Sequence, residues 1–270
     1  TWELAGKYPK ILDDDVVGSA ARDLFADAKA MLDRLIDDGT LQCKGVYGLW
    51  RANRSQDDDV AIFATERSLE PTKIIVHLRQ QSPKPDDLAP NYCLADFVAP
   101  AGEEDYIGGF AVTAGLGIDT ALIPYGNDDY QQILVKSLAD RLAEAFAEYL
   151  HFKVRTDFWG YDAEEALSSD ALIRERYQGI RPAPGYPACP DHSQKAALFE
   201  LLDATNHTGM SLTDSFAMNP AASVSGWYFA HPESRYFGVG KIDRDQLLDY
   251  AKRTGLSEED AERTLRPLLN

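Results

Sequence analysis

The order in which strand-like and helix-like segments follow one another is the feature that most constrains the fold. After one helical pattern at 15–36, runs rich in β-branched and aromatic residues succeed one another through the first half of the chain. Helical patterns, in which apolar residues recur every three or four positions, gather in the second half. Because the two kinds of element come in blocks and do not alternate, we predict an α+β protein with a largely antiparallel sheet. The expected strands are 46–50, 60–63, 73–78, 92–98 and 106–113, and the expected helices are 15–36, 128–154, 168–176, 192–202, 243–253 and 257–268.

The size and charge of the chain restrict its organisation and its partners. With 270 residues the chain can bury one sizeable core, so 1–270 is treated as one domain. The net charge is −17, from 44 acidic and 27 basic residues, and so acidic a surface repels phosphate backbones and anionic membranes. We therefore expect neither nucleic acid nor a membrane among the partners. The three cysteines form no C-x-x-C pair, which is typical of a protein from the reducing cytoplasm.

The common signatures of catalysis and cofactor binding are missing from the sequence. No G-x-G-x-x-G follows a strand, and there is no Walker loop, no G-x-S-x-G and no H-E-x-x-H. A methyltransferase of the Rossmann type is therefore not expected. The five histidines are scattered without the spacing of metal ligands, so we expect no metal site.

One segment, 181–190, contains four prolines and one glycine and cannot form a helix. Each proline lacks an N–H donor, so the remaining backbone groups are open to partners outside secondary structure. Arg181 offers a planar fork suited to a carboxylate, Gly185 permits close approach of a ligand to the backbone, and Tyr186 adds an aromatic face. The segment is either a groove for a small zwitterion or nucleoside, or a rigid covering loop with a structural arginine.

Two other groups of residues have a simpler interpretation from their residue types alone. The aromatic residues concentrated in 223–229 and 234–238 are typical of a protein core. Glu144, on the long predicted helix, and Glu175 are most simply solvated carboxylates.

The segment 179–192, with an R-x-x-x-G-Y core at Arg181, Gly185 and Tyr186, closely resembles the signature of the activation domain of cobalamin-dependent methionine synthases. The resemblance starts at 4–9 and runs in the same order to the C-terminus, so it covers essentially the whole chain. Its further matching segments are 77–81, 91–97, 138–146 and 225–228.

The resemblance implies a function in methionine biosynthesis. Members of this family carry cobalamin in a separate domain, where it occasionally falls into an inactive, oxidised state. The activation domain binds S-adenosylmethionine, and with an electron from flavodoxin or a methionine synthase reductase the cobalt is re-methylated. The family fold is a curved α+β structure, with helices flanking a largely antiparallel sheet, which agrees with the prediction from the order of elements.

The resemblance also implies the roles of individual residues. Arg181 is expected to grip the methionine moiety, and the backbone around Ala183 and Gly185 to meet the nucleoside. Glu144 and Glu175 are expected near the sulfonium, whose positive charge carboxylates favour. The aromatic side chains expected to line the groove are Tyr186, Tyr236 and Phe237.

Three further expectations concern the surroundings of the bound ligand. His192 is expected to face the cobalamin domain. A further aspartate that binds S-adenosylmethionine in the family lies upstream of the segment matching Thr1, so we expect the chain to lack that contact. Phe237 stands where relatives often have Tyr, a difference of at most one hydroxyl contact.

Two functions of different classes are open at this point. The first is a domain that binds the methyl donor and contributes to methyltransferase activity only beside a cobalamin domain, with no turnover of its own. The second is a module that docks a redox partner and binds no small molecule. The segment 181–190 favours the first, and equilibrium binding of S-adenosylmethionine separates the two.

Overall fold

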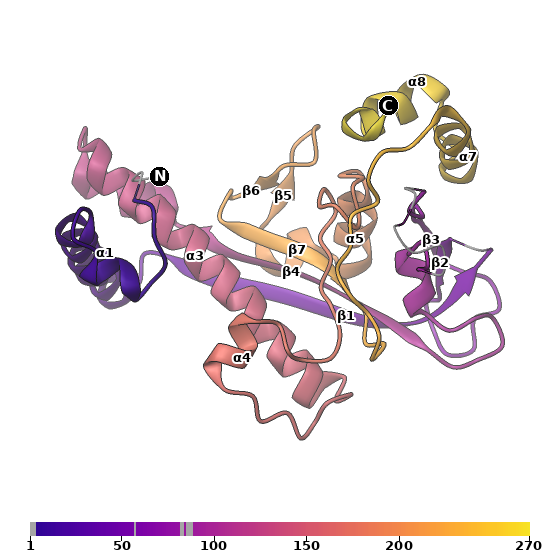
Figure 1. Ribbon diagram of the computed structural model, residues 1–270, viewed down its shortest axis with the longest axis horizontal. Coiled ribbons are helices and arrows are strands. Elements are labelled where there is room, and N and C mark those ends of the chain that lie inside the picture. The colour runs from indigo at the N-terminus through magenta and orange to yellow at the C-terminus, as the bar shows by residue number, and fades with distance from the viewer. Residues whose placement is uncertain (1–3, 57, 82–83, 85–88) are drawn as a thin grey trace.

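A single long antiparallel sheet organises the computed structural model, which describes residues 4–56, 58–81, 84 and 89–270. The strand order is β3-β2-β1-β4-β7, and each pair of neighbouring strands is antiparallel. The predicted α+β class with an antiparallel sheet is therefore confirmed. β1 and β4 run through most of the length of the molecule (Figure 1). The strands are β1 (Gln42–Ser55), β2 (Asp59–Ile62), β3 (Lys73–Val76), β4 (Tyr106–Leu116) and β7 (Ser223–Tyr228), with a separate small sheet of β5 (Ser211–Leu212) and β6 (Met218–Asn219).

The longest helix is α3 (Asp129–Lys153), as the sequence predicts for 128–154. It begins after Asp128, whose carboxylate accepts a hydrogen bond from the Gln131 backbone N–H at 3.1 Å and satisfies one of the free donors of the first turn. It ends in a π-helical turn, Val154–Phe158. This helix crosses the sheet diagonally (Figure 1). Its residue Glu144 lines the candidate site described below.

The sheet is covered on both faces because side chains on a strand alternate. Phe110 and Val112 of β4 pack with Ala147 of α3. Ala111, between them, packs with Leu198 of α5 (Gln194–Leu202) in the largest apolar cluster. The two helices thus lie on opposite faces of the sheet, and β7 forms an edge that the segment 180–182 joins.

Three other helices pack at the two ends of the sheet. Met31 of α1 (Gly18–Asp38) packs against α3, and Gly39 ends α1 in the left-handed conformation, as its position in the sequence predicts. At the other end, α7 (Arg244–Thr254) and α8 (Glu258–Leu265) share a cluster with Val76 of β3. The shorter helices are α2 (Ile118–Leu122), α4 (Ser169–Ile173) and α6 (Ala204–Thr208). Among the described residues, no helix combines the length and the apolar character needed to cross a membrane.

Three details differ from the sequence-based expectation. The strands β5, β6 and β7 were not expected. β1 continues beyond its expected end at residue 50 to Ser55, because residues 52–55 pair with β2, and the buried side-chain amide of Asn53 donates to the carbonyl of Glu103 at 2.8 Å. The segment expected as a strand at 92–98 instead holds a 3-10 turn, Leu94–Phe97. Its cause is local, since the Asp96 carboxylate accepts from the Cys93 backbone N–H at 2.8 Å.

Candidate functional site

The proline-rich segment extends along the free edge of β7. Ile180 and Phe229 exchange two backbone hydrogen bonds of 3.0 Å, and the Trp227 N–H donates to the Pro182 carbonyl at 3.0 Å. Gly226 allows this approach, because a Cβ there would lie 2.9 Å from the same carbonyl oxygen. Hydrogen bonds to β7 therefore anchor one side of the segment, and the backbone groups on its other side are free to contact residues or ligands outside the sheet.

The segment then turns sharply at Gly185. This residue has φ +100°, and a Cβ there would lie 2.1 Å from Cε1 of His192, so only glycine fits. The Gly185 N–H donates to the Cys189 carbonyl at 2.7 Å and closes a short loop. Tyr186 projects from that loop and is 68% exposed.

A cavity of about 530 Å³ lies between this segment, α3 and the connection after β7, a size typical of small-molecule sites. Its walls are largely apolar, with Val224 of β7 at the base and Pro182 and Pro187 from the segment. It brings together six of the eight residues expected from the resemblance to contact S-adenosylmethionine. They are Glu144, Arg181, Ala183, Tyr186, Tyr236 and Phe237.

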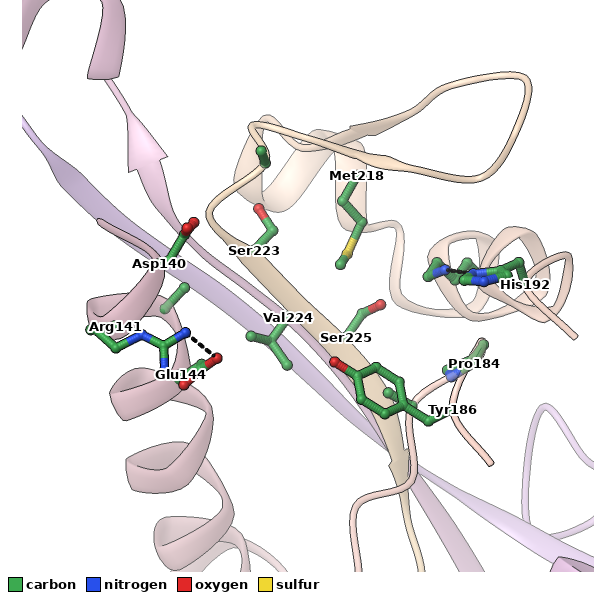
Figure 2. A pocket seen from close by; sticks show the side chains of 14 residues that line it. Asp140, Arg141, Glu144, Pro184, Tyr186, His192, Met218, Ser223, Val224 and Ser225 are labelled. Atoms are coloured by element: carbon green, nitrogen blue, oxygen red, sulfur yellow. Dashed lines mark hydrogen bonds and ion pairs between the residues drawn. The ribbon is translucent and has the colours of Figure 1, made fainter. Parts of the chain in front are cut away.

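A second cavity, of about 310 Å³, adjoins the first and shares Glu144, Ala183, Tyr186 and Val224 with it. Figure 2 shows Tyr186 reaching over β7, with Glu144 and Arg141 on α3 facing it and His192 beyond Pro184 on the other side. The two cavities together form a groove between α3 and the proline-rich segment.

The Arg181 guanidinium is partly engaged within the protein. Nη2 donates to Glu148 at 2.5 Å, and Nη1 donates to the Tyr177 hydroxyl at 2.6 Å and to Nδ1 of His151 at 3.2 Å. The Arg181 backbone N–H donates to the Tyr236 hydroxyl at 3.0 Å. A guanidinium has five N–H donors. The Nε–H and one Nη2–H make no hydrogen bond to the described residues, so the guanidinium keeps two donors for a further acceptor such as a carboxylate.

The chain resembles known proteins over essentially its whole length. The family model for the activation domain of vitamin B12 dependent methionine synthase matches residues 1–255. The chain belongs to this family. It is also similar to the crystal structure of a MetH reactivation domain bound to AdoHcy, with 57% sequence identity and a TM-score of 0.95, over 100% of this chain and 83% of that one. The curved α+β fold expected for the activation domain is confirmed by this likeness.

Glu144 and Glu175, the two glutamates expected near the ligand, differ in position, because only Glu144 lines the cavity. Glu144 stands at the rim shared by both cavities, where its carboxylate accepts from Arg141 at 2.8 Å. Glu175 follows α4 with φ +51°, is exposed and does not line the cavity. Burial raises the pKa of Tyr236; Arg181 lowers it, and the charges of Glu175 and Glu148 add to the rise.

His192 lies in the second cavity, on the side away from α3 (Figure 2). Its Nδ1 accepts a hydrogen bond from Nζ of Lys195 at 2.7 Å. Burial and the Lys195 charge lower the pKa of His192, so the ring is neutral at pH 7 and its Nε2–H is left as the donor.

Sequence reasoning did not single out the partners of Arg181. Glu148 and His151 are spaced by three on α3 and therefore share a face, which is the one signal that could have marked them. Tyr177 reaches them from the loop after α4. In contrast, Trp227, Tyr228 and Phe229 were predicted to be core and are at most 1% exposed. Among the described residues, no group of three or more His, Cys, Asp or Glu side chains could hold a metal ion.

Proposed function

We propose that this chain binds S-adenosylmethionine in the cavity between α3 and the proline-rich segment, and presents its methyl group for reductive re-methylation of cobalamin. The observation that carries the proposal is Arg181, which lines a largely apolar cavity of about 530 Å³ and keeps two guanidinium donors that no described residue takes. The related MetH reactivation domain bound to AdoHcy, at 57% identity, supports the choice of ligand. AdoHcy is S-adenosylhomocysteine, the same molecule without the methyl group.

The chemistry of the cavity suits each part of this ligand. The carboxylate of the methionine moiety would take the Nε–H and Nη2–H donors of Arg181, a bidentate, charge-assisted contact. The nucleoside would lie against the backbone around Ala183 and Gly185 and the ring of Phe237. The Glu144 carboxylate at the rim would favour the positive sulfonium, with Glu175 adding to the negative field from outside the cavity.

The chain positions the methyl donor and needs no general base of its own. A reduced cobalamin held by a partner domain would supply the nucleophile. The second cavity, next to the first, is the side from which this domain would approach, with the Nε2–H of His192 directed at it. Tyr186, which lines both cavities and is 68% exposed, would be covered by the docked domain and would screen the sulfonium from water. Catalysis would then arise from proximity between two domains.

A reductant must supply one electron for this reaction. We propose flavodoxin or a methionine synthase reductase, acting on the cobalamin domain while the chain holds the methyl donor. The isolated chain should show no methyl transfer to small molecules, nucleic acid or protein, because no base is placed beside a second substrate.

The test is to mix the chain with a separately expressed cobalamin domain and a one-electron reductant, and to follow methylcobalamin by its absorbance. Formation that depends on S-adenosylmethionine is the expected result. Equal formation without S-adenosylmethionine, or none at saturating concentrations of both proteins, contradicts the proposal. A module that only docks a redox partner would give the second of these outcomes.

A further inference from the structure

His151 is a fully buried histidine of α3 that the proposed function does not use. Its Nδ1 lies 3.2 Å from Nη1 of Arg181, and its Nε2 lies 3.3 Å from the Tyr161 hydroxyl. The ring therefore connects the arginine of the cavity to a tyrosine in the loop after the π-turn.

The protonation state of His151 follows from its partners. A guanidinium can only donate hydrogen bonds, so Nδ1 must carry a lone pair and the proton must sit on Nε2. The Nε2–H then donates to the Tyr161 hydroxyl. Burial and the charges of Arg155 and Arg181 lower the pKa of His151 well below its usual value, which keeps the ring neutral.

The orientation of the His151 ring is also determined. It stacks on Tyr228, with ring centroids 4.9 Å apart and planes at 16°, and meets Tyr177 edge-on at 5.1 Å. Tyr161 packs closely against the backbone of Gly179, which has φ +89°, since a Cβ there would lie 2.6 Å from the tyrosine hydroxyl oxygen. The acceptor offered to Arg181 is thus a rigid one.

Three acceptors, Nδ1 of His151, the Tyr177 hydroxyl and Glu148, take three of the four Nη–H donors of Arg181. A free arginine side chain has about 2 kcal/mol of rotamer entropy to lose on binding. Held at three points, the Arg181 guanidinium has already lost most of it before a ligand arrives.

We infer that His151 is a positioning residue for ligand binding, which fixes the Arg181 guanidinium so that its Nε–H and second Nη2–H meet the carboxylate of the ligand. The inference rests on the proposed function, and it adds which buried groups set the geometry of the site. His151 itself touches no part of the ligand.

The test compares two ligands on the variant His151→Phe, which keeps a planar ring on Tyr228 and removes the acceptor. S-adenosylhomocysteine carries the amino-acid carboxylate, whereas 5′-methylthioadenosine keeps the nucleoside and lacks it. Losing one hydrogen bond to a charged group should weaken S-adenosylhomocysteine binding about tenfold. Binding of 5′-methylthioadenosine should not change. The matched control is His207→Phe at an exposed position of α6, which should change neither.

A second variant separates positioning from folding. In His151→Gln the side-chain amide oxygen can replace Nδ1 as the acceptor for Arg181. This variant should keep S-adenosylhomocysteine affinity within about threefold of the wild type. If His151→Phe does not fold, Glu148→Gln gives the same comparison of two ligands, since it weakens the hold on Nη2 without adding bulk. In either variant, equal weakening of both ligands means that the residue serves folding alone and overturns the inference.

A measurement without ligand gives an independent readout. A guanidinium held by His151, Tyr177 and Glu148 rotates slowly, so the two ¹⁵Nη signals of Arg181 should be separate in the wild type and merge in His151→Phe. Merged signals in the wild type overturn the inference. If these signals are separate but the wild type does not bind S-adenosylhomocysteine, the proposed function fails while the anchoring of Arg181 stands.

Discussion

Two arginine–glutamate pairs lie near the C-terminal end of α3, and they differ in how completely the protein encloses them. Arg155 meets both oxygens of Glu165, at 2.5 and 2.9 Å, and both side chains are at most 1% exposed. Arg181 meets a single oxygen of Glu148 at 2.5 Å, with side chains 18% and 35% exposed. The first pair is closed to ligands, whereas the second keeps donors for one.

The difference shows that arginine can stabilise the fold at one position and bind a ligand at another. A bidentate pair in a dry interior satisfies its own charges, and its removal leaves a buried charge unpaired. In a pair at a cavity wall the two charges neutralise each other, but the arginine still has N–H groups that can donate to a ligand. The Arg155 guanidinium also lies 3.9 Å from the ring centroid of Tyr177. The buried Arg155–Glu165 pair therefore supports Tyr177, whose hydroxyl accepts a hydrogen bond from Arg181.

The largest effect is expected from Arg155→Met, which leaves the Glu165 carboxylate buried without its partner. The free energy of unfolding should fall by about 3–5 kcal/mol, measured by urea denaturation. The double variant Arg155→Met with Glu165→Leu should recover most of that loss, because no buried charge remains. A single variant as stable as the wild type would mean that this pair is not part of what holds the fold.

Arg181→Ala should act on binding and leave stability nearly unchanged. Losing the bidentate contact to the ligand carboxylate should cost about 2–5 kcal/mol of binding free energy, enough to abolish detectable S-adenosylmethionine binding in calorimetry. The Glu148 Oε1 is buried without a partner, but the side chain is 35% exposed overall, so water that fills the space left by Arg181 can solvate its charge. Unchanged affinity in a folded Arg181→Ala protein would remove this arginine from the site.

A smaller effect is expected from Gly185→Ala, because φ is +100° and the new Cβ would meet His192. The strained loop should lower both stability and affinity by about 1–3 kcal/mol. Gly39→Ala is the matched control, since Gly39 also has a positive φ of 59° but no atom lies within 4 Å of a Cβ there. That control should lower the melting temperature and leave affinity as it was. Equal affinity in both variants would show that the loop at Gly185 does not shape the cavity.

The smallest effects are expected at the aromatic wall. Tyr236→Phe removes the hydroxyl that accepts from the Arg181 backbone N–H at 3.0 Å, which should weaken ligand binding about fivefold, or about 1 kcal/mol. Phe237→Tyr, in contrast, adds one hydroxyl and should change affinity less than the Tyr236 variant does. A reversed order of these two effects, measured by calorimetry, would place the ligand nearer Phe237 than we propose.

The parts of the molecule that follow from local pattern could be predicted from the sequence. The blocked order of elements predicts the antiparallel sheet, and the prolines around Arg181 predict an extended segment. The hydrogen bonds of Arg181 to Glu148 and Tyr177 could not be predicted, because these residues come together only when α3 packs beside the proline-rich segment. The 3-10 turn at 94–97 was missed because the Asp96 carboxylate competes with strand pairing, an effect that apolar periodicity does not register.

Calorimetric titration of S-adenosylmethionine into three folded proteins tests the central claim most directly. They are the wild type, Arg181→Ala and the double variant Arg155→Met with Glu165→Leu. We predict saturable binding with one site per chain in the wild type and in the double variant, and none in Arg181→Ala. Absence of saturable binding to the folded wild type, or equal binding to all three proteins, would contradict the assignment of the cavity beside Arg181 as the S-adenosylmethionine site.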